Sequence, residues 1–487
     1  YGIVGLWNET ATWFRTGKNG TIPDATLSCA VTPEYLGLGY IIGPKIAGEL
    51  ASGGVLSWLA LIPLISIFVP ETRLVQDLTN LGFSDAWRAG HTHAEWIYRA
   101  YVRYIGAGAV ACAGVMTLIK TLPTIVGAFR ESVKSIGAGA GTAKKVRTDD
   151  DLGMGIVVVG SVVLALLIAV LPGIPHGPFP GSLVMSLLVV VFGFFFVTVS
   201  SRIVGIIGTS SNPISGMTIA TLMGTCVVFV VIGRTGDVYQ AVALCVGALV
   251  CIAAANAGAT SQDLKTGYIV GATPRRQQIG FIIGVLVSTV VIGGTLFLLD
   301  RTYAGGEAHG IGTSALPAPQ ATLMATIIKG LLAQNLPWAP VLVGVFLAFM
   351  AQMAGAHALS WAVGAYLPLS TTLPIFIGGQ MKSLADKMRH KKEKAKEKEE
   401  GDLSSGMLYA TGLVAGGSLG GVLIAVVAFL GDAVLHMDKP TLLEKLDIGE
   451  RFYPAIKNGI PGDVLGAIVF AGLCFLLVKN ARKDLEA

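Results

Sequence analysis

The sequence predicts an all-α, polytopic integral membrane protein, and three observations support this prediction. Hydrophobic residues make up 53% of its 487 positions, and only 13% are charged, about half the share of a soluble protein. The mean hydropathy is +0.68. The apolar residues form long runs that do not alternate as the strands of a membrane barrel would. Composition therefore excludes a soluble enzyme, a fibrous repeat and a disordered chain.

The candidate membrane segments follow from length. A helix needs about 20 mostly apolar residues to cross the roughly 30 Å hydrocarbon core of a bilayer. About twelve segments meet or approach this condition, some of them as broken or re-entrant helices: residues 32–51, 52–70, 99–127, 152–172, 179–202, 217–233, 238–259, 277–299, 337–355, 358–379, 406–430 and 461–479.

Four regions follow from these segments and from the charges between them. We expect a polar extracytoplasmic loop at 1–31, a transmembrane core at 32–379, a basic cytoplasmic linker at 380–405, and C-terminal transmembrane helices with a cytoplasmic tail at 406–487. The linker is typical of a solvated, topology-setting segment, and contact with anionic lipids is the alternative. Because the chain opens with Tyr1 rather than Met, we expect it to be part of a longer protein.

Lysine and arginine are sorted between two sets of loops. The loops at 130–151, 260–276 and 380–405, the tail at 479–487 and Arg202 carry 20 of them, whereas the remaining loops carry 11. Cytoplasmic loops of membrane proteins hold the excess of positive charge. The C-terminus is therefore expected in the cytoplasm, and the net charge of +5 gives no reason to expect a nucleic-acid partner.

This topology requires some hydrophobic segments to be broken. The stretch 338–380 contains no Asp, Glu, Lys or Arg, yet it must begin outside and end inside, so we expect one crossing and a re-entrant hairpin broken at Pro368 and Pro374. Residues 203–217 pose the same problem. Irregular backbone at membrane depth is tolerated where it is buried in protein or lines a watery cavity.

An internal echo suggests a duplication. Residues 39–54 read GYIIGPKIAGELASGG, and residues 364–379 read GAYLPLSTTLPIFIGG. Both have an early glycine, an internal proline and a closing glycine pair, and they are 325 positions apart. Repeats combined with broken helices are typical of secondary transporters. At this offset, the counterpart of the 209–217 loop would lie before Tyr1.

The segment 209–217 (TSSNPISGM) is a candidate binding site for an anion. Asn212 is a good N-cap and Pro213 suits the first helical position, so the helix would direct free N–H groups at the loop. Together with the hydroxyls of Ser210, Ser211 and Ser215, this end could bind a carboxylate within the membrane. A capped turn at a membrane interface explains the same residues equally well.

Three ionisable residues occupy the segment 32–51. Helical spacing places Lys45 and Glu49 on the same face as Glu34, and Pro44 frees the carbonyl of Tyr40 for binding. Buried ionisable groups by default mark a transport pathway or a proton site. The alternative is a Lys45–Glu49 pair that reaches one membrane interface.

Further candidates lie in two other segments. In residues 257–274, Asp263 and Lys265 could gate or couple transport, although a simple loop ion pair is the favoured interpretation. Gln352 and His357 precede a loop with three hydroxyls between two prolines, formed by Ser370, Thr371 and Thr372. A lone histidine such as His357 is more often a satisfied residue of the helix bundle than a proton carrier.

Other patterns have structural explanations. Glycines 412, 416 and 420 repeat on one helix and favour close helix packing, for which the face of a homodimer is one candidate. Catalytic motifs are absent, so we expect no enzyme, no cofactor and no metal site. His91, His93 and Glu95 form a run with ligand residues, but it lies in a predicted exterior loop.

Four motifs resemble the bacterial branch of the oligopeptide transporter family. They are SSNPISGMT, ATSQDLKTGYIVGATP, EYLGLGYIIGPKIAG with GGVLSWLALIPLI, and AVGAYLPLSTTLPIFIGG, and the similarity spans most of residues 30–480. The family is related to yellow stripe-like metal-chelate transporters. The resemblance implies proton-coupled import of a small peptide or of a peptide-like metal chelate such as a siderophore. It also implies more spans than this chain shows.

The resulting hypothesis is alternating-access transport in the bacterial inner membrane. Residues 210–216 would hold a substrate carboxylate, and Glu34 or Glu49 would take up the proton. Lys45 would neutralise or bind the substrate, and the broken 358–379 segment would complete the cavity. A membrane-embedded enzyme or a channel is the alternative function.

Overall fold

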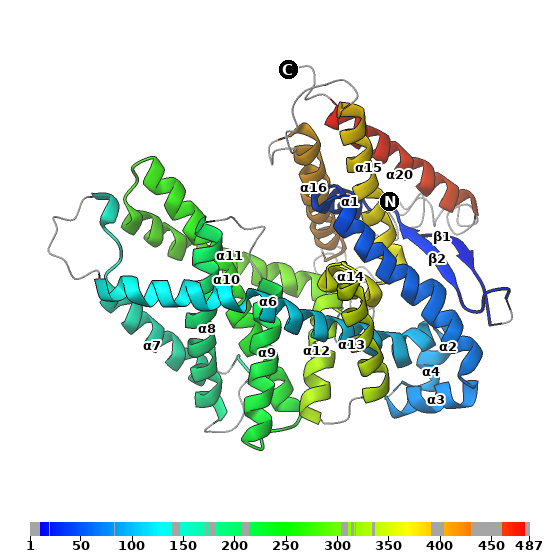
Figure 1. Ribbon diagram of the computed structural model, residues 1–487, viewed down its shortest axis with the longest axis horizontal. Coiled ribbons are helices and arrows are strands. Elements are labelled where there is room, and N and C mark those ends of the chain that lie inside the picture. The colour runs from blue at the N-terminus through cyan, green and yellow to red at the C-terminus, as the bar shows by residue number, and fades with distance from the viewer. Residues whose placement is uncertain are drawn as a thin grey trace. The chain divides into compact units, whose positions relative to one another are not determined.

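The computed structural model describes residues 10–18, 20–81, 83–138, 147–171, 173–175, 181–206, 214–302, 310–312, 316, 318, 319–333, 337–390, 404–429 and 460–482. Helices dominate these residues, which confirms the all-α prediction (Figure 1). Six helices are long and apolar enough to cross a membrane, namely those at Pro33–Phe68, Ser182–Gly205, Asp237–Ile269, Pro274–Thr302, Ser405–Phe429 and Pro461–Ala481. The protein is therefore a multi-pass integral membrane protein.

The chain divides into two compact units. The first holds residues 1–110, 295–319 and 339–487, and the second holds residues 111–294 and 320–338. The described elements of the N-terminal third are β1 (Thr10–Arg15), β2 (Thr26–Ala30), α1 (Pro33–Val55), the π-helix η1 (Leu56–Leu61), α2 (Ile62–Phe68), α3 (Glu71–Asn80), α4 (Asp85–Ala89), α5 (His93–Ile97), the π-helix η2 (Tyr98–Val102) and α6 (Arg103–Ala138).

The remaining elements are mostly apolar helices. They are the short 3₁₀-helix η3 (Arg147–Asp149), then α7 (Met154–Val170), α8 (Gly181–Ile206), α9 (Ile214–Val231), α10 (Asp237–Ile269), α11 (Pro274–Thr302), α12 (Pro319–Ala333), α13 (Trp338–Met353), α14 (Ala358–Tyr366), α15 (Leu369–His390), α16 (Ser405–Phe429) and α20 (Ile460–Ala481).

Several predicted boundaries differ from the structure. No loop separates segments 32–51 and 52–70, because α1, η1 and α2 follow one another directly from Pro33 to Phe68, and the one break in this stretch lies earlier, at Gly43. The predicted loop at 260–276 is mostly helix, since α10 continues to Ile269. The predicted linker at 380–405 begins as the last turns of α15, and its residues 391–403 lie outside the described part.

The predicted exterior loops also contain secondary structure. The polar segment 1–31 includes an antiparallel hairpin of β1 and β2, and the segment 71–95 contains α3, α4 and most of α5. The predicted loop at 300–336 includes α12, a 15-residue apolar helix.

The second unit packs around α8, α9 and α10. Its core joins Met185 of α8, Phe229 of α9 and Val246 of α10, all of which are fully buried. Polar contacts also cross between helices, because Ser200 of α8 donates a hydrogen bond to the carbonyl of Ala254 in α10. In contrast, the apolar stretch of α11 buries none of its residues against the rest of the described structure. This helix therefore offers an extended surface to lipid.

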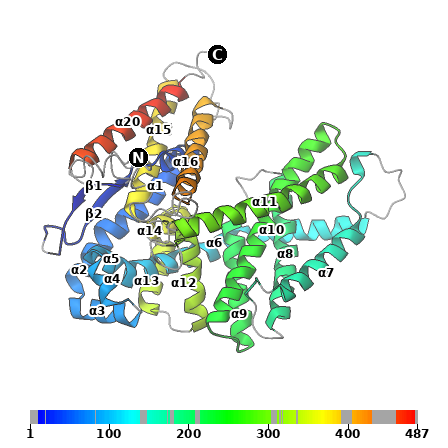
Figure 2. The same cartoon turned by 180° about the vertical axis from the view of Figure 1, so that it is seen from behind.

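The first unit centres on α1. This helix packs against α14, α15 and α16, and α20 packs against α15 and α16 (Figure 2). Tyr40 of α1 is fully buried in a cluster with Ala410 of α16 and Leu477 of α20. The hairpin packs against α15 and α20.

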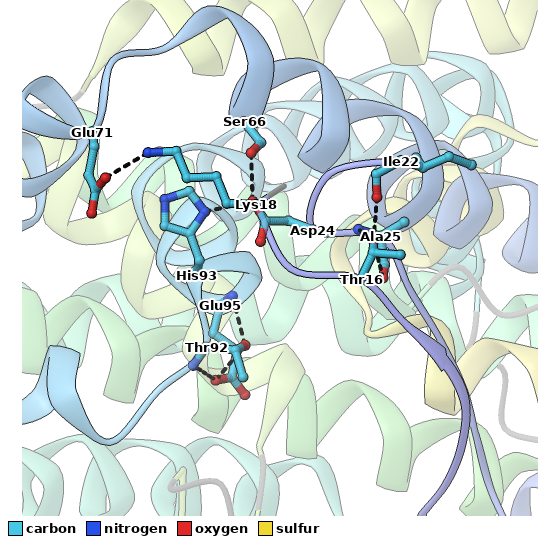
Figure 3. A network of polar contacts seen from close by, with 10 residues as sticks. All are labelled: Thr16, Lys18, Ile22, Asp24, Ala25, Ser66, Glu71, Thr92, His93 and Glu95. Atoms are coloured by element: carbon cyan, nitrogen blue, oxygen red, sulfur yellow. Dashed lines mark hydrogen bonds and ion pairs between the residues drawn. The ribbon is translucent and has the colours of Figure 1, made fainter. Parts of the chain in front are cut away.

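A polar network ties the hairpin loop to the helices that follow α1 (Figure 3). The buried carboxylate of Asp24 accepts a hydrogen bond of 2.6 Å from Ser66 of α2, and it lies 2.6 Å from Nδ1 of His93 in α5. At the surface, Lys18 forms an ion pair of 2.6 Å with Glu71, and this hydrogen-bonded ammonium lowers the pKa of the Glu71 carboxyl.

In the same region, the side chains of the His91, His93 and Glu95 run have separate partners. The His91 ring stacks on Trp87 and contacts its carbonyl, whereas His93 contacts Asp24. Glu95 closes a capping box with Thr92. These ligand atoms point to different partners, and within the described ranges no group of three His, Cys, Asp or Glu side chains could hold a metal.

Candidate functional site

The candidate site is the crossing of two broken helices in the first unit. Helix α1 is interrupted at Gly43, whose φ of 84° and ψ of 170° are not helical, and it resumes at Pro44. The second helix ends as α14 at Tyr366 and resumes as α15 at Leu369, after the extended residue Leu367 and Pro368. A φ of 84° strongly favours glycine, which explains why the first break falls at Gly43.

The two broken helices approach each other through glycines. A Cβ atom on Gly39 would lie 1.9 Å from the carbonyl oxygen of Ile375, and one on Gly364 would lie 2.0 Å from that of Leu50. Gly364 stands 325 positions after Gly39, and Ile375 stands 325 positions after Leu50. A shift of 325 positions, the offset of the sequence echo, therefore converts each of these contacts into the other.

Two further pairs of contacts obey the same relation. Gly53 faces the carbonyl of Trp361 while Gly378 faces that of Leu36, and Gly54 faces Thr372 while Gly379 faces Ala47. The starts of α1 and α14, at Pro33 and Ala358, are also 325 positions apart. The predicted echo thus corresponds to a local two-fold pseudo-symmetry, in which each broken helix is the other's partner.

A hydrogen bond joins the two broken helices. His357, the N-cap of α14, places Nδ1 at 2.9 Å from Oε1 and 3.1 Å from Oε2 of Glu49 in α1. The Glu49 side chain is only 10% exposed, whereas that of His357 is 59% exposed. The carboxylate is thus shielded by protein, whereas the ring lies at the surface of the described chain. The sequence had indicated both residues as proton-coupling candidates, and the structure brings them together.

The break between α14 and α15 is stabilised by residues that the sequence analysis did not single out. Ser57 of η1 donates a hydrogen bond of 2.6 Å to the carbonyl of Ala365, and the hydroxyl of Tyr98 in η2 donates one of 2.8 Å to that of Tyr366. Trp58 stacks on Tyr98 with a centroid distance of 5.5 Å. Both donors lie in π-helices, which occur frequently at functional sites.

Arginine 103 approaches the same break. Its guanidinium forms a hydrogen bond with the side chain of Tyr366. Arg99 and Arg103 are charged residues within an apolar segment, and this pattern could have indicated the region from the sequence. Ser57 and Tyr98 carried no comparable signal, because an isolated hydroxyl in an apolar run is common.

The prediction that Glu34, Lys45 and Glu49 share one face is wrong. The Glu34 side chain lies against Gly417 of α16 with a buried Oε2 that has no hydrogen-bond partner among the described residues. Lys45 is exposed, and Glu49 faces His357. The cause is Gly43, which is not helical, so the residues of α1 before and after it do not follow one regular helix. Helical spacing therefore does not place Glu34 on the face of Lys45 and Glu49.

The pairing alternative for Lys45 is also not observed. The Glu49 carboxylate contacts His357, and the described residues include no ion pair of Lys45. The predicted contact residue Tyr40 is buried in the core, with the ammonium of Lys382 5.9 Å from its ring centroid. Gln352 lies near the end of α13, and its carbonyl accepts a hydrogen bond from Gly355 just before His357.

The predicted hydroxyl loop is the first turn of α15. Ser370 and Thr371 are partly exposed there, whereas Thr372 is fully buried and its hydroxyl faces Gly54 of α1. Only Pro368 marks a break, because Pro374 lies inside α15, which continues past it. The loop is therefore part of the crossing.

The other candidates lie in the second unit or outside the described residues. Asp263 is exposed on α10, and Lys265 donates a hydrogen bond of 3.0 Å to the carbonyl of Gly205 rather than pairing with Asp263. Ser215 falls in the first turn of α9. Ser210, Ser211 and Asn212 lie outside the part that the structure describes.

The glycine stripe of α16 makes no close contact within the described chain. A Cβ atom on Gly412, Gly416 or Gly420 would have no neighbour within 4 Å. The close approach of α16 to α1 instead uses Gly37, which faces Ala410, and Gly417, which faces Glu34. Packing by the predicted stripe is thus not found among the residues that the structure describes.

Comparison with known proteins decides the family. The family model of the OPT oligopeptide transporter protein matches residues 6–428. The chain belongs to the oligopeptide transporter family. A protein of Haemophilus influenzae, provisionally described as an oligopeptide transporter, is 29% identical over 512 residues, covering 96% of this chain and 76% of that protein. The broken helices of this transporter, at 33–55 and 358–390, lie within the matched range.

Proposed function

We propose that the protein is a proton-coupled importer of small peptides that works by alternating access. The observation that carries the proposal is the contact of Glu49 with His357 across the two broken helices. An ionisable group inside a membrane segment is costly unless it has a partner, and such groups commonly form proton relays. Proton uptake by this pair would change the interaction that joins α1 to α14.

The pseudo-symmetric crossing supports alternating access. Secondary transporters are commonly built from repeats, with discontinuous helices forming the substrate and ion sites at the repeat interface. Here α1 and the α14–α15 helix are both discontinuous and contact each other reciprocally. A symmetric pair of this kind can adopt two equivalent arrangements, one open to each side of the membrane.

The substrate is proposed to be a zwitterionic or anionic peptide. Lys45 is an exposed cation two residues beyond the break in α1, and Ser370 and Thr371 offer hydroxyls just beyond the break in α15. The segment 210–216 before α9 is the proposed carboxylate site. The description of the Haemophilus influenzae relative favours peptides. A peptide-like metal chelate is the second candidate.

Uptake by the purified protein in proteoliposomes tests the proposal. With the interior more alkaline than the exterior, we expect saturable accumulation of labelled di- to tetrapeptides and less of ferric siderophores. Vesicles without a pH gradient and vesicles without protein are the controls. Unsaturable flux with single-channel currents would instead indicate a channel, and release of hydrolysed peptide would indicate an enzyme. No gradient-dependent uptake of either substrate class would refute the proton coupling.

The orientation belongs to the same proposal. The excess of Lys and Arg in the loops at 130–151, 260–276 and 380–405 supports a cytoplasmic location for these loops and for the C-terminus, with the protein in the inner membrane. Protons and peptide would then enter together. We also propose, on the basis of composition alone, a homodimer that forms through the exposed glycine stripe of α16.

A further inference from the structure

We propose that the turn between α10 and α11 binds the headgroup of an anionic phospholipid. A cavity of about 500 Å³ lies at this turn, within the second unit, and three arginines line it. Its lining residues are Arg147, Asp150, Thr273, Arg275, Arg276 and Ile279. Three guanidinium groups against one carboxylate leave an excess of positive charge, so the cavity favours an anion. This inference does not depend on the transported substrate.

Two hydrogen bonds to backbone carbonyls connect the segments that line the cavity. One guanidinium nitrogen of Arg147 donates a hydrogen bond of 2.6 Å to the carbonyl of Gly271, and the amide of Arg275 donates one of 2.9 Å to the carbonyl of Asp150. These bonds fix the segment around Arg147 to the turn.

Two arginines are available to a ligand. Arg275 and Arg276 are exposed, and in the described ranges neither side chain forms a hydrogen bond or an ion pair. A guanidinium presents several N–H donors in a planar fork that matches phosphate oxygens. Two such groups on adjacent residues, which line one cavity together with Arg147, form a suitable site for one phosphodiester.

The position of the cavity favours a lipid over a free phosphate ion. The turn joins two helices that are both long and apolar enough to cross a membrane, so it lies at a membrane surface. Ile279 of α11 belongs to the cavity wall, and Ile282, Ile283 and Leu286 continue along α11 as exposed side chains. A phospholipid would place its phosphate among the arginines and its acyl chains along this apolar surface. Basic pockets at the cytoplasmic interface commonly bind anionic headgroups.

Binding of short-chain phosphatidylglycerol to the purified, detergent-solubilised protein tests the inference. We expect saturable binding that is stronger than that of phosphatidylcholine. Each basic residue near a membrane surface contributes about 1 kcal/mol, so the Arg275→Gln, Arg276→Gln double variant should bind about 25-fold more weakly. The Arg275→Lys, Arg276→Lys variant keeps both charges but loses the planar forks, so its affinity should lie between those of the wild type and the glutamine variant.

The control variant lies at the other end of the same helix. Arg301→Gln removes an exposed arginine whose guanidinium lies 5.4 Å from the ring centroid of Phe297, and we expect unchanged lipid binding. Equal affinity of the double variant and the wild type would overturn the inference. Inorganic phosphate that binds as tightly as the lipid would show a simple anion site instead.

Salt provides a test on the unaltered protein if the double variant does not fold. The screening length falls to about 3 Å at about 1 M salt, so an arginine–phosphate site must lose affinity under this condition. Phosphatidylglycerol binding that is independent of salt would contradict the role of the arginines. Binding that weakens with salt only for phosphatidylglycerol, and not for phosphatidylcholine, would support it.

Discussion

The Glu49→Gln variant is expected to lose proton-driven accumulation of peptide while it retains peptide exchange. With one proton per peptide, a pH difference of one unit supplies about 1.36 kcal/mol, which corresponds to about tenfold accumulation. Glutamine has nearly the same shape as glutamate but cannot take up a proton at this position. The accumulation ratio in proteoliposomes should therefore fall from about tenfold to about one.

Exchange measurements separate this effect from misfolding. Counterflow, the exchange of labelled for unlabelled peptide, requires the substrate site and the change between outward-open and inward-open states, but no net proton movement. We therefore expect counterflow to persist in Glu49→Gln. His357→Gln should show the same pattern, because His357 is the partner of Glu49. Glu71→Gln is the matched control, since Glu71 pairs with Lys18 on the exposed surface. Undiminished accumulation by Glu49→Gln would remove the pair from the mechanism.

The second large effect is expected for alanine at the glycines of the crossing. A Cβ atom on Gly39 or Gly364 would lie within 2.0 Å of a backbone oxygen of the partner helix, so the helices would have to separate. Overpacking of this kind typically costs about 1–3 kcal/mol. Because the two contacts are counterparts, Gly39→Ala and Gly364→Ala should lower the thermal unfolding midpoint by similar amounts.

Gly284→Ala, in α11, provides the reference for that measurement. A Cβ atom there would have no neighbour within 4 Å, and alanine is a better helix former than glycine by up to about 1 kcal/mol. We therefore expect its unfolding midpoint to be unchanged or higher. Midpoints of Gly39→Ala and Gly364→Ala that match the wild type would contradict the close crossing of the helices.

Much of this fold could be predicted from the sequence because membrane helices are long apolar runs. The echo of residues 39–54 at residues 364–379 even predicted the offset that relates the contacts of the crossing. Local patterns could not show that the two echoes contact each other, since a repeat in sequence does not specify where its copies meet. That information lies in tertiary packing.

The candidate site shows the same limit. Charge in an apolar run singled out Glu49 and Lys45, and it also made Glu34 a candidate. Helical periodicity then failed, because it assumed an uninterrupted helix through Gly43. The partner of Glu49 is His357, a contact between residues 308 positions apart that no local pattern contains. Ser57 and Tyr98 were missed because their role depends on the break that they stabilise.

Proton movement with the substrate is the most direct test of the central claim, that the Glu49–His357 pair couples peptide transport to protons. A pH-sensitive dye trapped inside proteoliposomes reports proton entry when peptide is added outside. We predict that peptide acidifies the interior of vesicles with the wild-type protein, but not of vesicles with Glu49→Gln. Peptide uptake without acidification in the wild type, or unchanged acidification in Glu49→Gln, would contradict the account.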